Sequence, residues 1–135
     1  MANFSNFIQS EQQCFITLKP QDKKPVQTDW LNNGQTFDAA HVLGHNVGIL
    51  SGKLSGILDV DLDCTEAVSL ADAILPKPHA TFGRGAPDSL HYLYRGNSFG
   101  PRRAFTSTGS NNATLVELRG DGSQTMIPPS IHPNG

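Results

Sequence analysis

The stretch that decides the fold is Ser55-Gly56-Ile57-Leu58-Asp59-Val60-Asp61-Leu62-Asp63, in the middle of the chain. Successive side chains of a β-strand point to opposite faces, so this stretch has an apolar face and an acidic face. The apolar face carries Leu58, Val60 and Leu62. The acidic face carries Asp59, Asp61 and Asp63. Alternate residues lie roughly 7 Å apart along a strand, which lets neighbouring carboxylates share a cation. The stretch predicts a core strand whose acidic face meets a metal, a base or solvent.

The composition is that of an ordinary folded domain. The chain has 135 residues, of which 37% are hydrophobic and 16% charged, and its net charge is −2. This length suffices for one domain with a buried core. Because the net charge is slightly negative, a nucleic-acid-binding function would need locally concentrated basic residues. The two cysteines have no metal-ligand spacing, and neither a signal peptide nor a membrane span is recognisable. We expect a soluble cytoplasmic protein with reduced thiols.

The first half of the chain reads as short helices and strands. Helices are expected over 2–12, 37–43 and 64–75, and strands over 14–18, 46–51 and 56–63. The short turn at 51–53 predicts that the last two strands form a β-hairpin. Asp63 with Glu66 three residues later resembles a capping box, so Asp63 is expected to cap the third helix rather than bind metal.

The second half is mostly β. Strands are expected over 79–84, 90–95, 113–119 and 124–127, and the polar segment 97–112 is expected to be a mobile loop. Arg102 and Arg103 in that loop are expected mainly to favour solubility. Together these elements predict an α+β fold with a mixed or antiparallel sheet and flanking helices.

Two of these strands repeat the pattern of an apolar back and a polar front. One places Ser89 and His91 on its front, and the other places Glu117 and Arg119 there. If these strands share a sheet with the acidic strand, their fronts combine carboxylates, a histidine and arginines. Such a patch suits a polyphosphate bound with Mg²⁺ or Mn²⁺, because these hard cations prefer oxygen ligands.

The same residues, taken in order, resemble the primase–polymerase domain family of the archaeo-eukaryotic primase superfamily. The resemblance covers roughly residues 15 to 135, and the order and spacing of its motifs are more specific than any one motif. The segments that carry it are Lys19-Pro20, Lys24-Pro25, Trp30, Asn46-Val47-Gly48-Ile49, Ser51-Gly52-Lys53, Asp59-Val60-Asp61, Ser89-Leu90-His91, Glu117, Gly120-Asp121-Gly122 and Pro128-Pro129-Ser130-Ile131-His132-Pro133. One departure is the segment 82–88, which is longer than the family's usual tight turn.

The resemblance implies an RRM-like core and specific roles for the front residues. The implied ligands of the catalytic Mg²⁺ or Mn²⁺ ions are Asp59, Asp61 and Glu117. The implied contacts to the phosphates of the incoming nucleotide are Ser89, His91, Arg119 and Lys53. Arg119 has a second expected role, an ion pair with Asp121.

The implied activity is metal-dependent nucleotidyl transfer, in which a DNA primase or polymerase adds nucleotides from NTP or dNTP to a template-directed strand. The implied partners are nucleoside triphosphates, single-stranded or primed DNA, and a fused or separate helicase, in phage or plasmid replication. Residues 1–135 are expected to form one catalytic domain, either the N-terminal part or a shortened version of a longer replication protein. Three alternatives stay open: a silent nucleotide- or DNA-binding module of the same fold, a metal-dependent phosphoesterase, and a structural domain whose acids face water.

Overall fold

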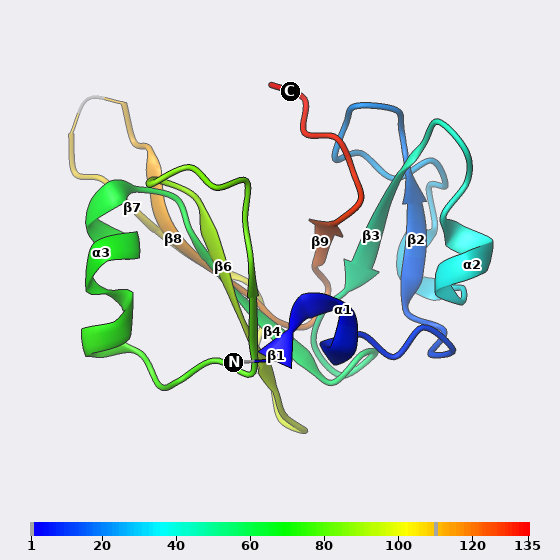
Figure 1. Cartoon of the computed structure of the whole chain (residues 1–135), viewed down its shortest axis with the longest axis horizontal. Helices are drawn as coiled ribbons and strands as arrows, with labels where there is room; N and C mark the ends of the chain where they lie inside the picture. The colour runs from blue at the N-terminus through cyan, green and yellow to red at the C-terminus, as the bar shows by residue number, and fades with distance from the viewer. Residues whose placement is uncertain (1, 110) are drawn as a thin grey trace.

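The computed structural model describes residues 2–109 and 111–135, and within these ranges the strands form two sheets (Figure 1). The larger sheet has the strand order β1 (Ala2–Asn3), β5 (Ala80–Phe82), β6 (Leu90–Arg95), β4 (Ile57–Leu62), β8 (Thr114–Arg119) and β7 (Arg103–Thr106). The smaller sheet has the order β2 (Phe15–Leu18), β3 (Asn46–Leu50) and β9 (Gln124–Ile127). β1 and β5 pair in parallel and the other neighbours antiparallel. The predicted α+β fold with a mixed sheet is confirmed.

β4, the acidic strand, lies inside the larger sheet between β6 and β8. The predicted hairpin of β3 and β4 is wrong, because β3 belongs to the smaller sheet and pairs there with β2 and β9. Both β3 and β4 are already paired along both edges. Where the chain passes from one sheet to the other, an isolated bridge joins Gly52 and Ile57. The segment between them therefore carries the chain from one sheet to the other.

The apolar back of the larger sheet is covered by α3 (Thr65–Ile74), on the side away from the smaller sheet (Figure 1). Val60 and Leu62 of β4 pack there with Ala71 of α3. The prediction that Asp63 caps this helix is wrong: the N-cap is Cys64, whose Sγ accepts a hydrogen bond from the backbone N–H of Ala67. The β-pairing extends through Asp63, whose N–H donates to the Leu115 carbonyl, so the helix starts later than expected.

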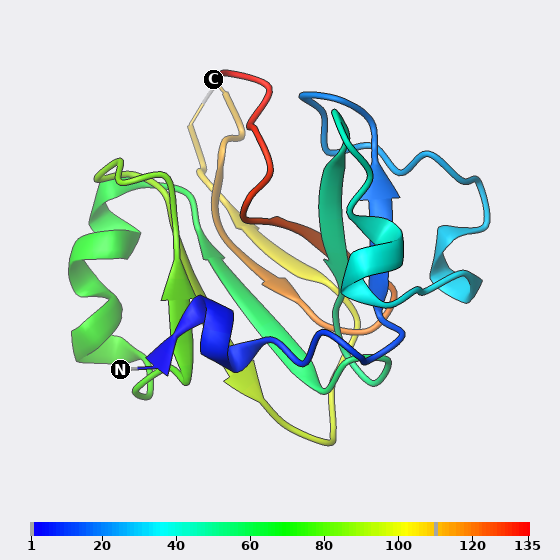
Figure 2. The same ribbon diagram turned by 45° about the vertical axis from the view of Figure 1, so that its right-hand side comes forward.

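The polar front of the larger sheet faces the smaller sheet. A hydrophobic core shared by both sheets includes Phe15, Ile49, Leu93 and Ile127. After β9 the chain runs between the two sheets to its C-terminal end, as both views show (Figure 2). The front residues of β4 therefore face an interior space and not open solvent.

The other helices are short: α1 (Phe4–Phe7), the 3-10 helix η1 (Trp30–Asn32) and α2 (Phe37–Ala40). The expected loop 97–112 is wrong in part, because it contains the edge strand β7, which pairs with β8. Of the helices in the described ranges, none has the length and apolar character needed to cross a membrane.

Candidate active site

The antiparallel register of three strands assembles the site. Asp61 of β4 lies directly opposite His91 of β6 on one side and Glu117 of β8 on the other. Asp59 lies opposite Arg119 in the same way. Residues directly opposite each other share a face of the sheet. The fronts of the three strands therefore combine into one polar patch, as the sequence pattern predicted.

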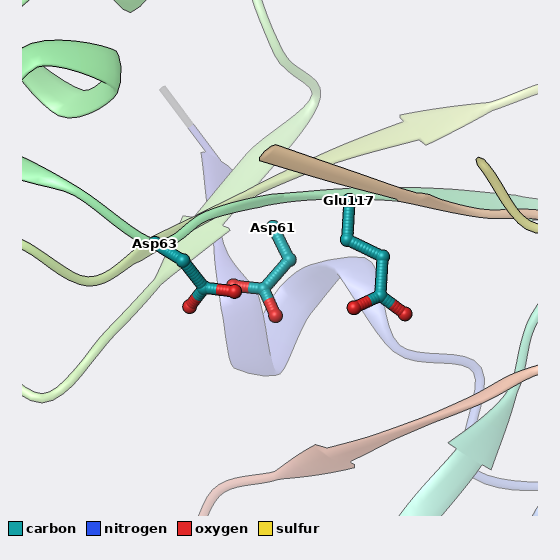
Figure 3. A group of neighbouring side chains, drawn as sticks. All are labelled: Asp61, Asp63 and Glu117. Carbon is teal, nitrogen blue, oxygen red and sulfur yellow. The ribbon is translucent and has the colours of Figure 1, made fainter. Parts of the chain in front are cut away.

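Asp61, Asp63 and Glu117 form an acidic cluster in which one carboxylate oxygen from each lies within 4.8 Å of the others. Figure 3 shows the three carboxylates on the same side of the strands that carry them. Asp61 and Glu117 are buried, whereas Asp63 is exposed. The sequence predicted Asp63 as a helix cap and not as a metal ligand. The alternation of side chains along the acidic strand nevertheless places it on this face.

The environment of Asp61 fits a bound cation. Its side chain is buried, and burial, the largest effect, raises the pKa of its carboxyl from 3.8 to about 6, despite the nearby His91 and Arg119. Within the described part of the chain, Asp61 Oδ1 has no hydrogen-bond partner. The three carboxylates offer the oxygen ligands that Mg²⁺ and Mn²⁺ prefer, and one of these oxygens, Asp61 Oδ1, has His91 Nε2 at 3.5 Å.

Arg119 reaches back among the carboxylates. Its Nη2 donates to Asp61 Oδ2 at 2.8 Å, its Nε donates to Glu117 Oε1 at 3.1 Å, and its Nη1 lies 3.7 Å from Asp59 Oδ2. Burial opposes its charge, but the carboxylates of Asp59, Asp61 and Glu117 together outweigh burial and raise its pKa. The expected ion pair with Asp121 is wrong: among the described residues, Arg119 makes its ion pairs with Asp59, Asp61 and Glu117. Asp121 Oδ1 accepts instead from the Lys53 backbone N–H.

Glu117 has a second cationic partner. Arg102 lies just before β7 and donates from Nε to Glu117 Oε1 at 2.6 Å, although its own side chain is 56% exposed. Burial works against ionisation of Glu117, but hydrogen bonds from Arg102 and Arg119 lower its pKa. Arg102 therefore contacts the site, although the sequence predicted a mobile loop there. The pairing of β7 with β8 brings it to Glu117.

Asp59 is the most buried acid of the site, at 1% exposure. Its Oδ2 accepts from Thr125 Oγ1 of β9 at 2.6 Å, which links the two sheets. The carboxylate also faces His91 Nδ1, at 3.0 Å from Oδ2 and 3.1 Å from Oδ1. Burial opposes protonation of His91, but the charge of Asp59, its hydrogen bond to the ring and the charge of Asp61 together outweigh burial and raise the His91 pKa. The His91 ring also stacks on Phe82, with 4.3 Å between the ring centroids. Asp59 and Phe82 together therefore fix the orientation of the ring.

A cavity of about 470 Å³ opens beside this patch. Ser89, His91 and Arg119 line it, together with Asp61 and Asp63. A cavity of this size accommodates a small organic ligand. Lys53 lies elsewhere, at the crossing between the sheets, so the structure does not bring it together with the other expected phosphate contacts.

The site is an acidic cluster beside a cavity that carries a serine, a histidine and an arginine. Residues 9–135 match the model of the Prim-Pol family, described as bifunctional DNA primase/polymerase, N-terminal. The chain belongs to this family. The Prim-Pol match covers nearly the whole chain and associates it with DNA primase or polymerase function and with nucleotide and DNA substrates. Among curated proteins, no significant match was found.

Proposed function

We propose that this Prim-Pol chain catalyses metal-dependent nucleotidyl transfer, adding nucleotides from NTP or dNTP to a template-directed strand. The observation that carries the proposal is the acidic cluster of Asp61, Asp63 and Glu117, two of which are buried, beside a cavity lined by His91 and Arg119. Nucleotidyl transfer needs a cation site and cationic phosphate contacts side by side. This cavity supplies the residues for both.

Asp61, Asp63 and Glu117 would hold one or two Mg²⁺ or Mn²⁺ ions. When bound, such ions neutralise phosphate charge and lower the pKa of an attacking hydroxyl. In the reaction, the 3′-oxygen of the growing strand bonds to the α-phosphorus, the bond to the β-phosphate breaks, and pyrophosphate leaves. The hydroxyl proton passes to solvent.

Ser89, His91 and Arg119 would bind the phosphates. Asp59 would act as a positioning residue, because its carboxylate contacts His91 and lies near Arg119. Asp59 as a direct metal ligand also stays a prediction, and it requires Thr125 Oγ1 and His91 Nδ1 to give up their hydrogen bonds to its oxygens. Arg119 would leave the carboxylates for a phosphate when a cation replaces it.

The test is nucleotide incorporation on a primed DNA template with Mn²⁺. Asp61→Asn and Glu117→Gln should each reduce the rate by about a hundredfold or more, a loss typical of removing one preorganised electrostatic group. Asp38→Asn, a matched change at an exposed acid, should leave the rate unchanged. Full activity of an Asp61→Asn/Glu117→Gln double variant would refute the proposal.

Other outcomes of the same assay would favour the alternatives. Nucleotide binding without incorporation would indicate a silent binding module, and shortening of the labelled strand would indicate a phosphoesterase. A helicase partner, a cytoplasmic location and a role in phage or plasmid replication stay predictions from the resemblance.

A further inference from the structure

A second cavity, of about 260 Å³, lies beside β2, η1 and α2. Among the described residues, none lines both this cavity and the candidate active site. Figure 1 places α2 at the opposite end of the molecule from α3, beyond the smaller sheet. The volume is just below the usual range of about 300–1,000 Å³ for sites of drug-sized ligands. The cavity therefore fits one small group, such as a single heterocyclic ring system.

The wall of this second cavity is uncharged and combines an aromatic ring with amides. Among the described residues that line it there is no aspartate, glutamate, lysine or arginine. Trp30 is half-buried and packs against the hydrophobic core, so the core holds the indole in place. Without a lining cation, a phosphate or carboxylate would be desolvated there without compensation, so the wall favours a neutral ligand. Its polar members include Gln27, Asn33, Gln35 and His45, and its apolar members include Trp30 and Val42.

The polar groups of the wall are available to a ligand. In the part of the chain that the structure describes, neither Gln27 nor Gln35 uses its side-chain amide in a hydrogen bond to another residue. His45 Nδ1 lies 3.4 Å from the Leu43 carbonyl, which leaves Nε2 as the ring nitrogen for a ligand. An amide both donates and accepts, as the edges of a nucleobase do, and an aromatic side chain offers a base a stacking surface. The chemistry of the wall therefore matches an unpaired nucleobase.

Three exposed lysines lie in the turn that leads to this cavity. Lys19, Lys23 and Lys24 follow β2 and are three of the ten basic residues of the chain. The Lys19 N–H donates to the Lys24 carbonyl at 2.8 Å, and the Val26 N–H donates to the Thr17 carbonyl at 3.0 Å. Val26 and Thr17 line the cavity, so these bonds fix the end of the turn at the cavity wall. Binding of a polyanionic strand requires such a local concentration of basic charge.

We propose that the second cavity binds one unpaired nucleobase, and that the lysine turn, residues 19–24, binds the phosphates beside that base. The neighbouring acids, Asp29 and Asp38, belong to η1 and α2 at the other wall, so the phosphates lie on the side of the lysines. The base belongs either to single-stranded DNA or to a free nucleoside, and only the DNA strand also uses the lysines. This inference does not depend on the proposed nucleotidyl transfer, because it concerns a separate cavity.

The test uses the fluorescence of Trp30, the only tryptophan of the chain. The full chain in EDTA is titrated with a single-stranded oligodeoxynucleotide of about ten residues, with a fully abasic strand of the same length, and with deoxyadenosine. A base stacked on Trp30 should quench its fluorescence, whereas the abasic strand, which offers only sugars and phosphates, should not. Quenching by deoxyadenosine at a lower concentration than by the strand would identify a free nucleoside as the source of the base.

Matched variants separate the base contacts from the phosphate contacts. Gln27→Ala and Gln35→Ala should each weaken binding of the intact strand by about 2- to 10-fold, the effect of one lost hydrogen bond. Gln9→Ala, at an exposed glutamine outside the cavity, should have no effect. Lys24→Ala should weaken binding of the intact and abasic strands alike, by about threefold, and Lys77→Ala should weaken neither.

Three results would overturn the inference: unchanged Trp30 fluorescence with both the strand and the nucleoside, equal quenching by the intact and abasic strands, or wild-type affinity in both glutamine variants. The proposed function fails or succeeds separately. A chain that does not extend primers but shows base-dependent quenching of Trp30 keeps the inference and loses the function. A chain that extends primers without any quenching of Trp30 keeps the function and loses the inference.

Discussion

Arg119 Nη2 donates a 2.8 Å hydrogen bond to Asp61 Oδ2, across the antiparallel pair of β8 and β4. The same guanidinium contacts Glu117, so it joins two members of the acidic cluster. A cation held between carboxylates in this way is a substitute for the divalent ion that the cluster is expected to bind. Arg119 therefore balances the charges of Asp61 and Glu117, and a bound Mg²⁺ or Mn²⁺ would replace it in this role.

Removing Arg119 should destabilise the metal-free protein more than the metal-bound protein. Arg119→Ala leaves buried carboxylates without their counter-charge, and we expect a loss of about 3 kcal/mol in the free energy of unfolding without divalent ions. Saturating Mn²⁺ should recover most of this loss. Urea unfolding with and without Mn²⁺ measures both values, and Arg103→Ala serves as the control. An equal loss in both conditions would contradict the substitution.

The sequence predicted the strands of the site and their faces but not all of its members. Alternation of apolar and polar residues was enough to place Asp61, His91, Glu117 and Arg119 on one front, because side chains alternate strictly along a strand. The capping assignment failed for Asp63, because Cys64 provides the cap and the β-pairing extends one residue further. The local sequence cannot decide whether Asp63 or Cys64 accepts the hydrogen bond from the first turn of the helix.

Contacts between segments far apart in the chain were not predictable. The β3–β4 hairpin was expected from a short turn, but both strands find better-placed partners elsewhere in the sequence. Arg102 was assigned to a loop because the sequence of β7 has no recognisable strand pattern. Only its pairing with β8 makes this segment a strand. The contact of Arg84 with His132 has the same origin, since these residues follow strands of different sheets.

Asp63 should contribute to metal affinity and little to stability. Asp63→Asn replaces an exposed carboxylate of the acidic cluster, and we expect Mn²⁺ binding to weaken by at least about tenfold, as for other groups that support a metal site. The melting temperature without metal should stay within about 2 °C, because an exposed substitution of this kind costs little. Calorimetry and thermal melting give the two values. Unchanged Mn²⁺ affinity would exclude Asp63 from the site.

The stability of the metal-free protein should fall as the pH rises from about 4 to 8. The folded-state pKa of Asp61 is raised to about 6, so the folded state binds the Asp61 proton more tightly and loses this advantage between about pH 4 and 6. The raised pKa of His91 acts in the same direction above its ordinary value of 6.5. Glu117, whose pKa is lowered, adds stability only as the pH rises through the acidic range near 4.5.

We expect the Asp61 contribution to be on the order of 2 kcal/mol. Chemical unfolding at pH 5 and pH 8 in EDTA measures the part of this contribution that is lost above pH 5. Saturating Mn²⁺ at pH 8 should restore stability, since a ligand that binds the folded state stabilises it by mass action. A metal-free protein that is more stable at pH 8 than at pH 5 would contradict this account of Asp61.

Asn46 should be the most sensitive residue outside the acidic cluster. Asn46→Asp keeps the side-chain shape but places a carboxylate against the carbonyls of Asp22 and Ile131, which accepted its N–H groups. We expect a loss of about 2–3 kcal/mol in unfolding free energy, the cost of unsatisfied buried polar groups. Asn97→Asp, at an exposed position, is the matched control and should be neutral. Equal melting temperatures for the two variants would show that Asn46 does not hold the C-terminal segment.

The most direct test of the account is a crystal of the protein soaked with Mn²⁺ and a non-hydrolysable deoxynucleoside triphosphate. We expect anomalous manganese density in contact with Asp61, Asp63 and Glu117, with Arg119 turned away from the carboxylates and triphosphate density in the cavity beside His91. Manganese density absent from the acidic cluster, with Arg119 still bonded to Asp61, would contradict it.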